Sequence, residues 1–131
     1  MKCFAFVAVV VTLVVLPVHA RAQVQTGADL LKNCQVVLER KPNNVAMLDG
    51  VSCLSYLRGM SETFSLWRVF NDRRNQKNPP PACVPNGVTA REIAIVVVKF
   101  IDRHPAEQHH AASDVALTAL MDAYPCNETS R

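Results

Sequence analysis

The stretch from Cys83 to Cys126 decides the fold, and it opens with the segment CVPNGVTARE. Within that segment Thr89 is followed three residues later by Glu92, which is the spacing of a capping box. This pair predicts that a helix begins directly after Thr89. Pro105 disfavours helical backbone at the residue before it, so the same helix is expected to end at His104.

The same stretch closes with a second apolar pattern, ALTALMDAYPC, which ends at Cys126. Leu117 and Leu120 recur at helical spacing, and Pro125 stops the helix that they predict. Two antiparallel helices of similar length place the start of the first beside the end of the second. The sequence therefore predicts a helical hairpin clasped by a disulfide between Cys83 and Cys126.

The N-terminus has the pattern of a secretory signal peptide. It carries one positive charge at Lys2, an apolar run over residues 3–16, and small residues at Ala20 and Ala22. A membrane anchor is the alternative, but the run is shorter than the roughly 20 residues that a spanning helix needs. We expect residues 1–22 to be a signal peptide, cleaved after Ala22 or Ala20, and the product to be periplasmic.

Removal of this leader leaves one domain over residues 23–131. Loss of Lys2 and Arg21 lowers the formal charge from +3 to +1, with both signs interspersed along the chain. A chain so close to neutral lacks the polybasic surface of a nucleic-acid-binding protein. A domain of this size has room for one modest hydrophobic core.

The exported chain keeps four of its five cysteines, which are Cys34, Cys53, Cys83 and Cys126. An even number of cysteines behind a signal peptide indicates disulfides, whereas a zinc site would need closely spaced ligand pairs. Cys34 and Cys53 lie at similar distances on either side of a turn at residues 41–44, so we expect them to pair. In the chain-entropy model the two expected disulfides stabilise the fold by roughly 3 and 4 kcal/mol.

Two more helices are expected before Cys83. Thr26 and Asp29 form a capping box that opens a helix running to about Arg40. Asn44 is the expected N-cap of a longer helix. In that helix small and apolar residues alternate by four and three positions, which predicts a continuous buried seam. The seam consists of Ala46, Gly50, Cys53, Leu57, Met60, Phe64 and Trp67.

Two features indicate tight packing between helices. Gly50 and Gly59 lie inside the long helix, where each costs about 1 kcal/mol relative to alanine and indicates a closely packed neighbour. In the helix after Thr89, Ile95 and Val98 widen the apolar stripe past half the circumference. Such a helix is either central in the bundle or buried in a dimer. The expected fold is an all-α, disulfide-stapled bundle of about four to five helices that forms a homodimer.

A polar, proline-rich stretch, NDRRNQKNPPP, occupies residues 71–81. Long loops in compact domains are commonly functional or mobile, and a solvated connector is the alternative here. The prolines stiffen the stretch, which lowers the entropy that it loses on binding. Arg73, Arg74 and Lys77 give it positive charge suited to an acidic cleft. These three residues are therefore the candidate partner-binding site.

The sequence carries no recognisable catalytic motif or cofactor site. His104, His109 and His110 gather near Glu107, but adjacent histidines on a helix point to different sides, and a spaced set of metal ligands is missing. We expect these side chains to be solvent-exposed and predict no metal and no cofactor. With the cysteines in disulfides and without a glycine-rich phosphate loop, a binding or structural protein is expected rather than an enzyme.

Four segments together carry a resemblance to a known family. They are Cys83-Val84-Pro85-Asn86-Gly87-Val88-Thr89, His104-Pro105 after the apolar helix, Ala119-Leu120 leading to Tyr124-Pro125-Cys126, and Cys53-Leu54-Ser55-Tyr56-Leu57-Arg58-Gly59. In the last segment Ser55 stands where the family usually has glycine. Over nearly all of the mature chain, the sequence resembles the Rap/Tai immunity proteins of type VI secretion amidases.

This resemblance implies a small, all-helical periplasmic protein, typically a homodimer, without catalytic activity. Its partner would be a peptidoglycan-cleaving amidase injected by sister cells, which the immunity protein binds and occludes. Relatives use a protruding loop for this contact, as we expect for residues 71–81. The main alternative is a small, acid-activated periplasmic chaperone, and a carrier of a small apolar ligand is a further one.

Overall fold

The structure is a computed structural model that describes residues 24–40, 43–74 and 78–126. Within these ranges it contains four α-helices, two 3-10 segments and one isolated antiparallel bridge between Thr26 and Ala111. The elements are α2 (Gly27–Gln35), a 3-10 segment (Val36–Leu38), α3 (Asn44–Arg73), α4 (Ala90–Arg103), a second 3-10 segment (Pro105–His109) and α5 (Ala112–Ala123). The predicted all-α, disulfide-stapled bundle is confirmed.

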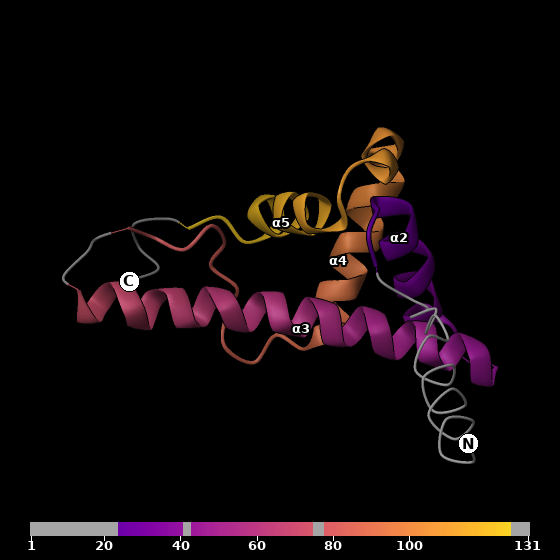
Figure 1. The fold of residues 1–131 in the computed structure, drawn as a ribbon, viewed down its shortest axis with the longest axis horizontal. Helices are drawn as coiled ribbons and strands as arrows, with labels where there is room; N and C mark the ends of the chain where they lie inside the picture. Colours follow the sequence, from indigo (N-terminus) through magenta and orange to yellow (C-terminus); the bar gives the residue numbers. More distant parts are fainter. Residues whose placement is uncertain (1–23, 41–42, 75–77, 127–131) are drawn as a thin grey trace, which may run out of the picture.

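The long helix α3 is the base of the molecule. Figure 1 shows it along the longest dimension, with α2, α4 and α5 stacked on one side of it. Its N-cap is Asn43, one residue before the predicted Asn44, because the extended backbone of Asn43 lets its Oδ1 accept from the N–H groups of Val45 and Ala46. Its last helical residue is Arg73.

The two capping boxes are present as the sequence predicts. At the start of α2, the Asp29 N–H donates to Thr26 Oγ1, while the Thr26 N–H donates to Asp29 Oδ2 at 3.1 Å. Thr89 and Glu92 do the same at the start of α4. α2 is shorter than expected, since its regular turns end at Gln35 and a 3-10 segment follows.

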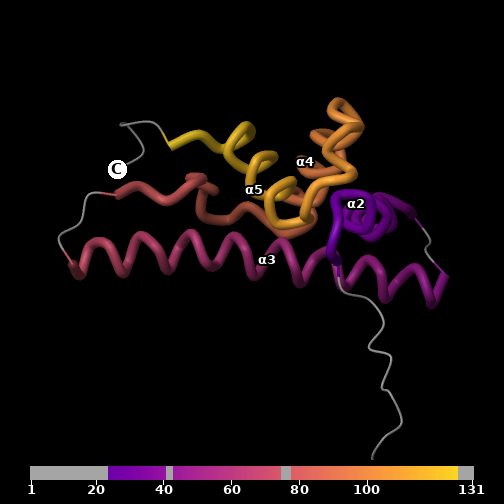
Figure 2. The backbone as a smooth tube through the Cα atoms, turned by 45° about the horizontal axis from the view of Figure 1, so that its top comes forward, coloured from indigo at the N-terminus to yellow at the C-terminus, as the bar shows by residue number. Residues whose placement is uncertain are grey.

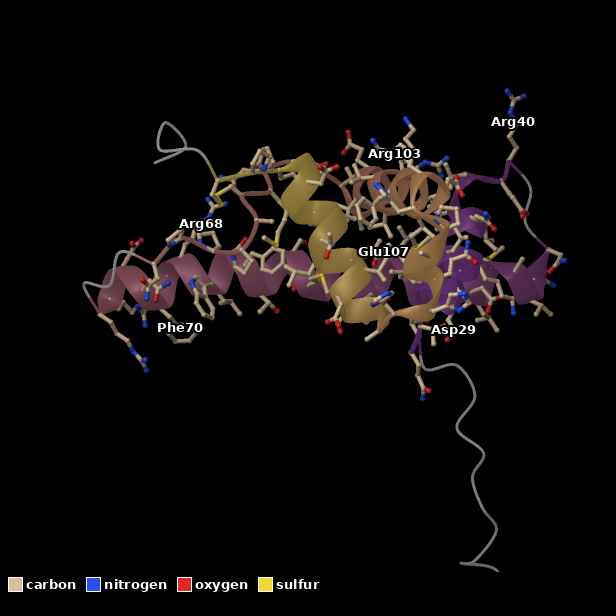
Figure 3. The ribbon with its side chains drawn as sticks, turned by 90° about the horizontal axis from the view of Figure 1, so that it is seen from above. Asp29, Arg40, Arg68, Phe70, Arg103 and Glu107 are labelled. Atoms are coloured by element: carbon tan, nitrogen blue, oxygen red, sulfur yellow. A yellow bond between two sulfur atoms is a disulfide. The ribbon has the colours of Figure 1, made fainter. Side chains whose placement is uncertain are left out.

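Both predicted disulfides are formed. Cys34 and Cys53 join α2 to α3 with Cα atoms 5.1 Å apart, and Cys83 joins Cys126 with Cα atoms 5.0 Å apart. The second bond links two non-helical segments, where the Cys83 N–H also donates to the Tyr124 carbonyl at 2.9 Å. The helices inside this clasp do not form the antiparallel hairpin that we expected, because α5 crosses α4 steeply (Figures 1 and 3).

Helix α4 is the centre of the core. It packs against α2, α3 and α5, and six of its residues are buried: Ile93, Ala94, Val97, Val98, Phe100 and Ile101. Val98, which the sequence placed on an over-wide apolar face, is only 7 % exposed within a single chain. The wide apolar surface of α4 is thus explained by the central position of this helix, and it no longer argues for a dimer.

The start of α2 is tied to the turn before α5. The Gly27 N–H donates to the His110 carbonyl, and the Ala112 N–H donates to the Gln25 carbonyl, each at 2.9 Å. A Cβ atom at Gly27 would overlap the carbonyl oxygen of Glu107, so this close approach of two backbones requires glycine. α2 therefore has a fixed position over α4.

The predicted seam of α3 is only partly buried. Gly50, Cys53, Leu57 and Phe64 face the core, but Trp67 is 45 % exposed. Asn71 lies on the buried side in place of a further apolar residue. Gly50 contacts a neighbour as expected, since a Cβ there would lie 3.6 Å from Val36 Cγ1, whereas a Cβ at Gly59 would meet nothing within 4 Å. The packing explanation for Gly59 is therefore wrong within one chain.

Candidate functional site

The predicted loop over residues 71–81 begins later than the sequence indicated. Residues 71–73 belong to the last turn of α3, and Arg74 is its C-cap. Residues 75–77, which include Lys77, lie outside the described residues. From Asn78 the chain runs back along α3 toward Cys83 (Figure 2), and we call residues 78–84 the returning segment. The described part of the candidate site is therefore a helix end beside this segment, not a free loop.

Asn71 fixes the position of the returning segment. Its side chain is 9 % exposed, and its Nδ2 donates to the Asn78 carbonyl at 2.8 Å. A buried amide of this kind costs free energy unless it is hydrogen-bonded. Asn71 thus holds the end of α3 to the returning segment and is not itself available to a partner.

Arg73 and Arg74 are exposed at the end of α3, as the sequence predicts. Among the described residues the ion pairs are Arg58–Glu62 and Arg103–Asp122, so neither arginine is paired there. Their charges are free to attract an acidic partner surface. Exposed charges of this kind contribute mainly to the rate of association and its salt dependence.

Arg68 is a functional candidate that sequence reasoning missed. Its side chain faces the returning segment, while Phe70 points away from it (Figure 3). One terminal nitrogen of Arg68 donates to the Val84 carbonyl at 3.5 Å, and its buried Nε has no hydrogen-bond partner. Its position four residues after Phe64 and three before Asn71 was the available signal, because that spacing turns it toward the core side.

An open hollow of about 390 Å³ lies between α3, α5 and the returning segment. Its walls are mainly apolar and its lining is Tyr56, Met60, Thr63, Phe64, Pro81, Ser113, Asp114 and Leu117. Burial raises the pKa of the Tyr56 hydroxyl, and the negative charge of Asp114 raises it further. The carboxylate of Asp114 forms no ion pair within the described part of the chain. The hollow would accept an apolar side chain, and its rim would favour a cation.

Three α3 residues that line the hollow, Tyr56, Met60 and Thr63, begin a row that runs along one edge of α3 to Arg74 at its end. Positions along this edge alternate by four and three residues, which places them in one row on the helix surface. We call this row the edge strip; it consists of Tyr56, Met60, Thr63, Trp67, Phe70 and Arg74. Trp67 and Phe70 are 45 % and 55 % exposed. Exposed aromatic residues beside an arginine are typical of protein–protein contact surfaces.

The family comparison fits a binding surface of this kind. The model of the family described as Rap1a immunity proteins matches residues 26–126. The chain belongs to this family. The resemblance seen in the sequence is therefore confirmed. Searches among curated proteins and among solved structures each gave no match.

The histidine group of this Rap1a-family chain does not form a metal centre in the part of the chain that is described. No group of three or more histidine, cysteine, aspartate or glutamate side chains there is placed to hold a metal ion. His104 instead closes α4: its Nδ1 lies 2.9 Å from the Phe100 carbonyl, and its ring packs on the Phe100 ring. His109 and His110 are exposed, as expected.

Among the described residues, no helix is both long enough and apolar enough to cross a bilayer. α3 has sufficient length at 30 residues, but charged and polar residues recur along it.

Proposed function

We propose that this immunity protein acts in the periplasm, where it binds and occludes a type VI secretion effector that cleaves peptidoglycan as an amidase. The observation that carries the proposal is the match of residues 26–126 to Rap1a immunity proteins. The edge strip, with its exposed aromatic residues and its open hollow, supports a large protein partner over a small ligand. Inhibition by occlusion needs no catalytic residue and no cofactor in the immunity protein.

We assign the electrostatic part of this contact to Arg73, Arg74 and Lys77. Arg74 ends the edge strip and Arg73 is exposed next to it, while Lys77 lies outside the described residues. The mature chain that carries these charges is close to neutral. An acidic surface around the amidase cleft would attract them over the range of the Debye length, about 10 Å at moderate salt. We assign the apolar part of the contact to Trp67, Phe70 and the hollow beside Tyr56.

The test uses the mature chain and, where an amidase is encoded beside its gene, that amidase, with purified peptidoglycan as substrate. Wild-type protein is expected to stop hydrolysis at equimolar concentration. Trp67→Ala with Phe70→Ala should weaken binding at least tenfold, because aromatic residues at the centre of an interface contribute most of its energy. An active amidase in the presence of excess wild-type chain would rule out the proposed function.

The arginine assignment has its own matched control. Replacement of Arg73, Arg74 and Lys77 by serine should lower affinity about tenfold at low salt and reduce the salt dependence. Serine at Arg40, Arg91 and Lys99, which are exposed elsewhere, makes the same change in net charge and should leave affinity nearly unaltered. Equal effects of the two triple variants would show that only net charge matters.

Export of the chain is part of the proposal, with residues 1–22 as the signal peptide and residues 23–131 as the mature domain. This leader lies outside the described residues, and the sequence pattern supports the assignment. Mass spectrometry of protein recovered from the periplasm should give Gln23 as the first residue. A first residue of Arg21 would indicate cleavage after Ala20, and an uncleaved cytoplasmic chain would contradict export.

A periplasmic chaperone is the second candidate, and one observation favours it. Eight large apolar residues of α3 are exposed, and chaperones present such surfaces to unfolded proteins. The two functions differ in specificity, because a chaperone suppresses aggregation of unrelated proteins in acid. Suppression of aggregation at low pH without amidase inhibition would favour the chaperone.

A further inference from the structure

The hollow between α3, α5 and the returning segment has one negative charge on a mainly apolar wall. Asp114 is the only charged residue among the described residues that line it. Met60 and Leu117 are half-buried on the same wall, and Phe64 is 8 % exposed. At about 390 Å³ the hollow lies within the roughly 300–1,000 Å³ range of ligand pockets. It therefore has room for a long side chain with an apolar stem and a polar end.

The Asp114 carboxylate keeps one oxygen free for such a group. Its Oδ1 accepts a hydrogen bond from the Ser113 hydroxyl at 3.2 Å, and within the described ranges its Oδ2 has no donor and no ion-pair partner. Asp114 also lies in the first turn of α5, where a carboxylate stabilises the positive end of a helix. That role involves only α5 itself, so the α3 side chains on the other wall of the hollow are not needed for it.

Tyr56 brings an aromatic ring to the same hollow. Its side chain is half-buried on α3. Burial raises the pKa of its hydroxyl, and the negative charge of Asp114 raises it further. The two groups are thus close enough for the Asp114 charge to act on Tyr56. A carboxylate beside an aromatic ring attracts cations, because the face of the ring also carries partial negative charge.

Arginine is the protein side chain that matches these features together. Its aliphatic stem packs on apolar groups while its charged end reaches a polar partner. The guanidinium is flat, so its edge pairs with a carboxylate while its face stacks on an aromatic ring. Lysine has a similar stem, but its compact and strongly hydrated ammonium group lacks this flat face.

We propose that the hollow is the binding site for one arginine side chain of the amidase effector. The guanidinium pairs with Asp114 and stacks on Tyr56. The stem packs against Met60, Phe64 and Leu117. The inference rests on the proposed function, because the arginine belongs to the effector, and it adds a basic anchor residue to what the effector surface must present.

A protein partner is favoured over a small free cation because a region of opposite charge lies further along the edge strip. Between Tyr56 and Arg73, α3 rises by about 25 Å at about 1.5 Å per residue. This separation exceeds the Debye length of about 10 Å at moderate salt, so the hollow and the exposed arginines attract a partner separately. A surface that presents an arginine to the hollow and acidic groups to the end of α3 binds in one orientation only.

Two blocked amino acids test the chemistry of the hollow without the effector. The probes are Nα-acetyl-arginine methylamide and the matching citrulline compound, which has nearly the same shape without the charge. NMR titration of the mature chain should show shifts at Met60 and Leu117, and about fivefold higher affinity for the arginine probe. Asp114→Asn should remove that difference. Asp102→Asn, at an exposed position on α4, is the matched control and should keep it, and circular dichroism establishes that both variants are folded.

Several results of this titration would overturn the inference. Equal affinity for the two probes would mean that the hollow selects only apolar groups. Equal affinity for the corresponding lysine compound would mean that it selects charge without the flat guanidinium. Shifts at Met60 and Leu117 on dilution of the chain alone would mean that a second copy fills the hollow. Absence of shifts at these residues with either probe would mean that no side chain of this kind binds there.

A double-mutant cycle then identifies the source of the arginine. Each surface arginine of an amidase that the chain inhibits is replaced by glutamine, and inhibition is measured with wild-type chain and with Asp114→Asn. For one arginine, each single change should weaken inhibition about tenfold, and the two changes together should weaken it little further. Inhibition without any coupled arginine would overturn this inference and leave the proposed function intact. Absence of inhibition by the wild-type chain would reject the proposed function, and with it the effector as the source.

Discussion

Helices α3 and α4 both carry more apolar surface than one ordinary stripe, but the fold treats them in opposite ways. α4 lies between three other helices, and Val97 and Ile101 in it have no exposed surface. The described residues cover α3 along one side only, and Leu48 and Leu66 on its other side are more than half exposed. A wide apolar face predicted from the sequence thus indicates that a helix packs against neighbours. It does not identify whether these neighbours belong to the same chain.

The comparison corrects the reason for expecting a dimer. From the sequence, the wide apolar face of the helix after Thr89, which includes Val98, was either central in the bundle or a dimer interface. Val98 is buried within one chain, so a charged substitution there would disturb the fold.

The largest expected effect is a loss of folding stability on substitution in α4, which substitution on the exposed side of α3 should not cause. Val97→Asp places an unpaired carboxylate among fully buried side chains and should destabilise the fold by about 4 kcal/mol or more. Leu66→Asp changes an exposed side chain and should alter the stability of the monomer by less than about 0.5 kcal/mol. Urea denaturation followed by circular dichroism measures both. Similar losses for the two variants would contradict the contrast between α3 and α4.

The next largest effect is expected from loss of the Cys34–Cys53 disulfide, which joins α3 to α2, one of the helices that pack on α4. Cys34 and Cys53 are fully buried and close a loop with a sequence separation of 19. Replacing both by alanine should cost about 3 kcal/mol through the entropy of the unfolded chain. Thermal denaturation of the variant checks the value. A chain that is as stable as wild type would mean that packing of α2 on α3 suffices without the bond.

A smaller loss is expected at the free end of α3. Asn71→Leu removes the hydrogen bond to the Asn78 carbonyl and should cost about 2 kcal/mol. Because this bond holds the returning segment, the variant should also weaken amidase binding. Asp72→Leu, at an exposed neighbouring position, is the control for both measurements. Unchanged stability and affinity in Asn71→Leu would show that Cys83 alone fixes the segment.

The smallest effect is expected from loss of the N-terminal cap of α2, one of the helices that pack on α4. Thr26→Ala removes half of the α2 capping box and should cost about 1 kcal/mol. The Thr26 hydroxyl and then its backbone N–H bond the Asp29 carboxylate and hold its pKa below the ordinary value of 3.8. The stability that the ionised Asp29 carboxylate contributes is present at neutral pH and is lost as the pH falls through the lowered pKa of this group. Acid titration of unfolding should show a shallower loss below about pH 4 for Asp29→Asn than for wild type, and equal slopes would reject the role of the box.

Part of the candidate site followed from the sequence and part did not. Arg73 and Arg74 are exposed as predicted, because a polar run at the end of a helix has no apolar neighbours to cover it. The hollow was not predictable, since Tyr56 on α3 and Asp114 on α5 are far apart in the sequence. Arg68 was missed for the same reason: its partner, the Val84 carbonyl, is 16 residues away and reaches it only through the returning segment.

What the sequence determined by itself is local. The starts of α2 and α4 depend on hydrogen bonds between residues three apart, at Thr26 with Asp29 and at Thr89 with Glu92, and the end of α4 depends on Pro105. Such interactions involve only neighbouring residues, so the sequence states them directly. The pairing of the cysteines was also predicted correctly. For Cys83 and Cys126 the reason was wrong, because α5 crosses α4 steeply (Figure 1) and the bond joins two non-helical segments.

The tertiary structure alone decided which apolar faces are covered. Val98 and Trp67 are both apolar residues on predicted seams, yet one is buried and the other is half exposed. The difference comes from the steep crossing of α5 over α4 and from the one-sided stacking of helices on α3 (Figure 1). Burial depends on the position of distant segments, and that position is set by the summed packing of the whole core.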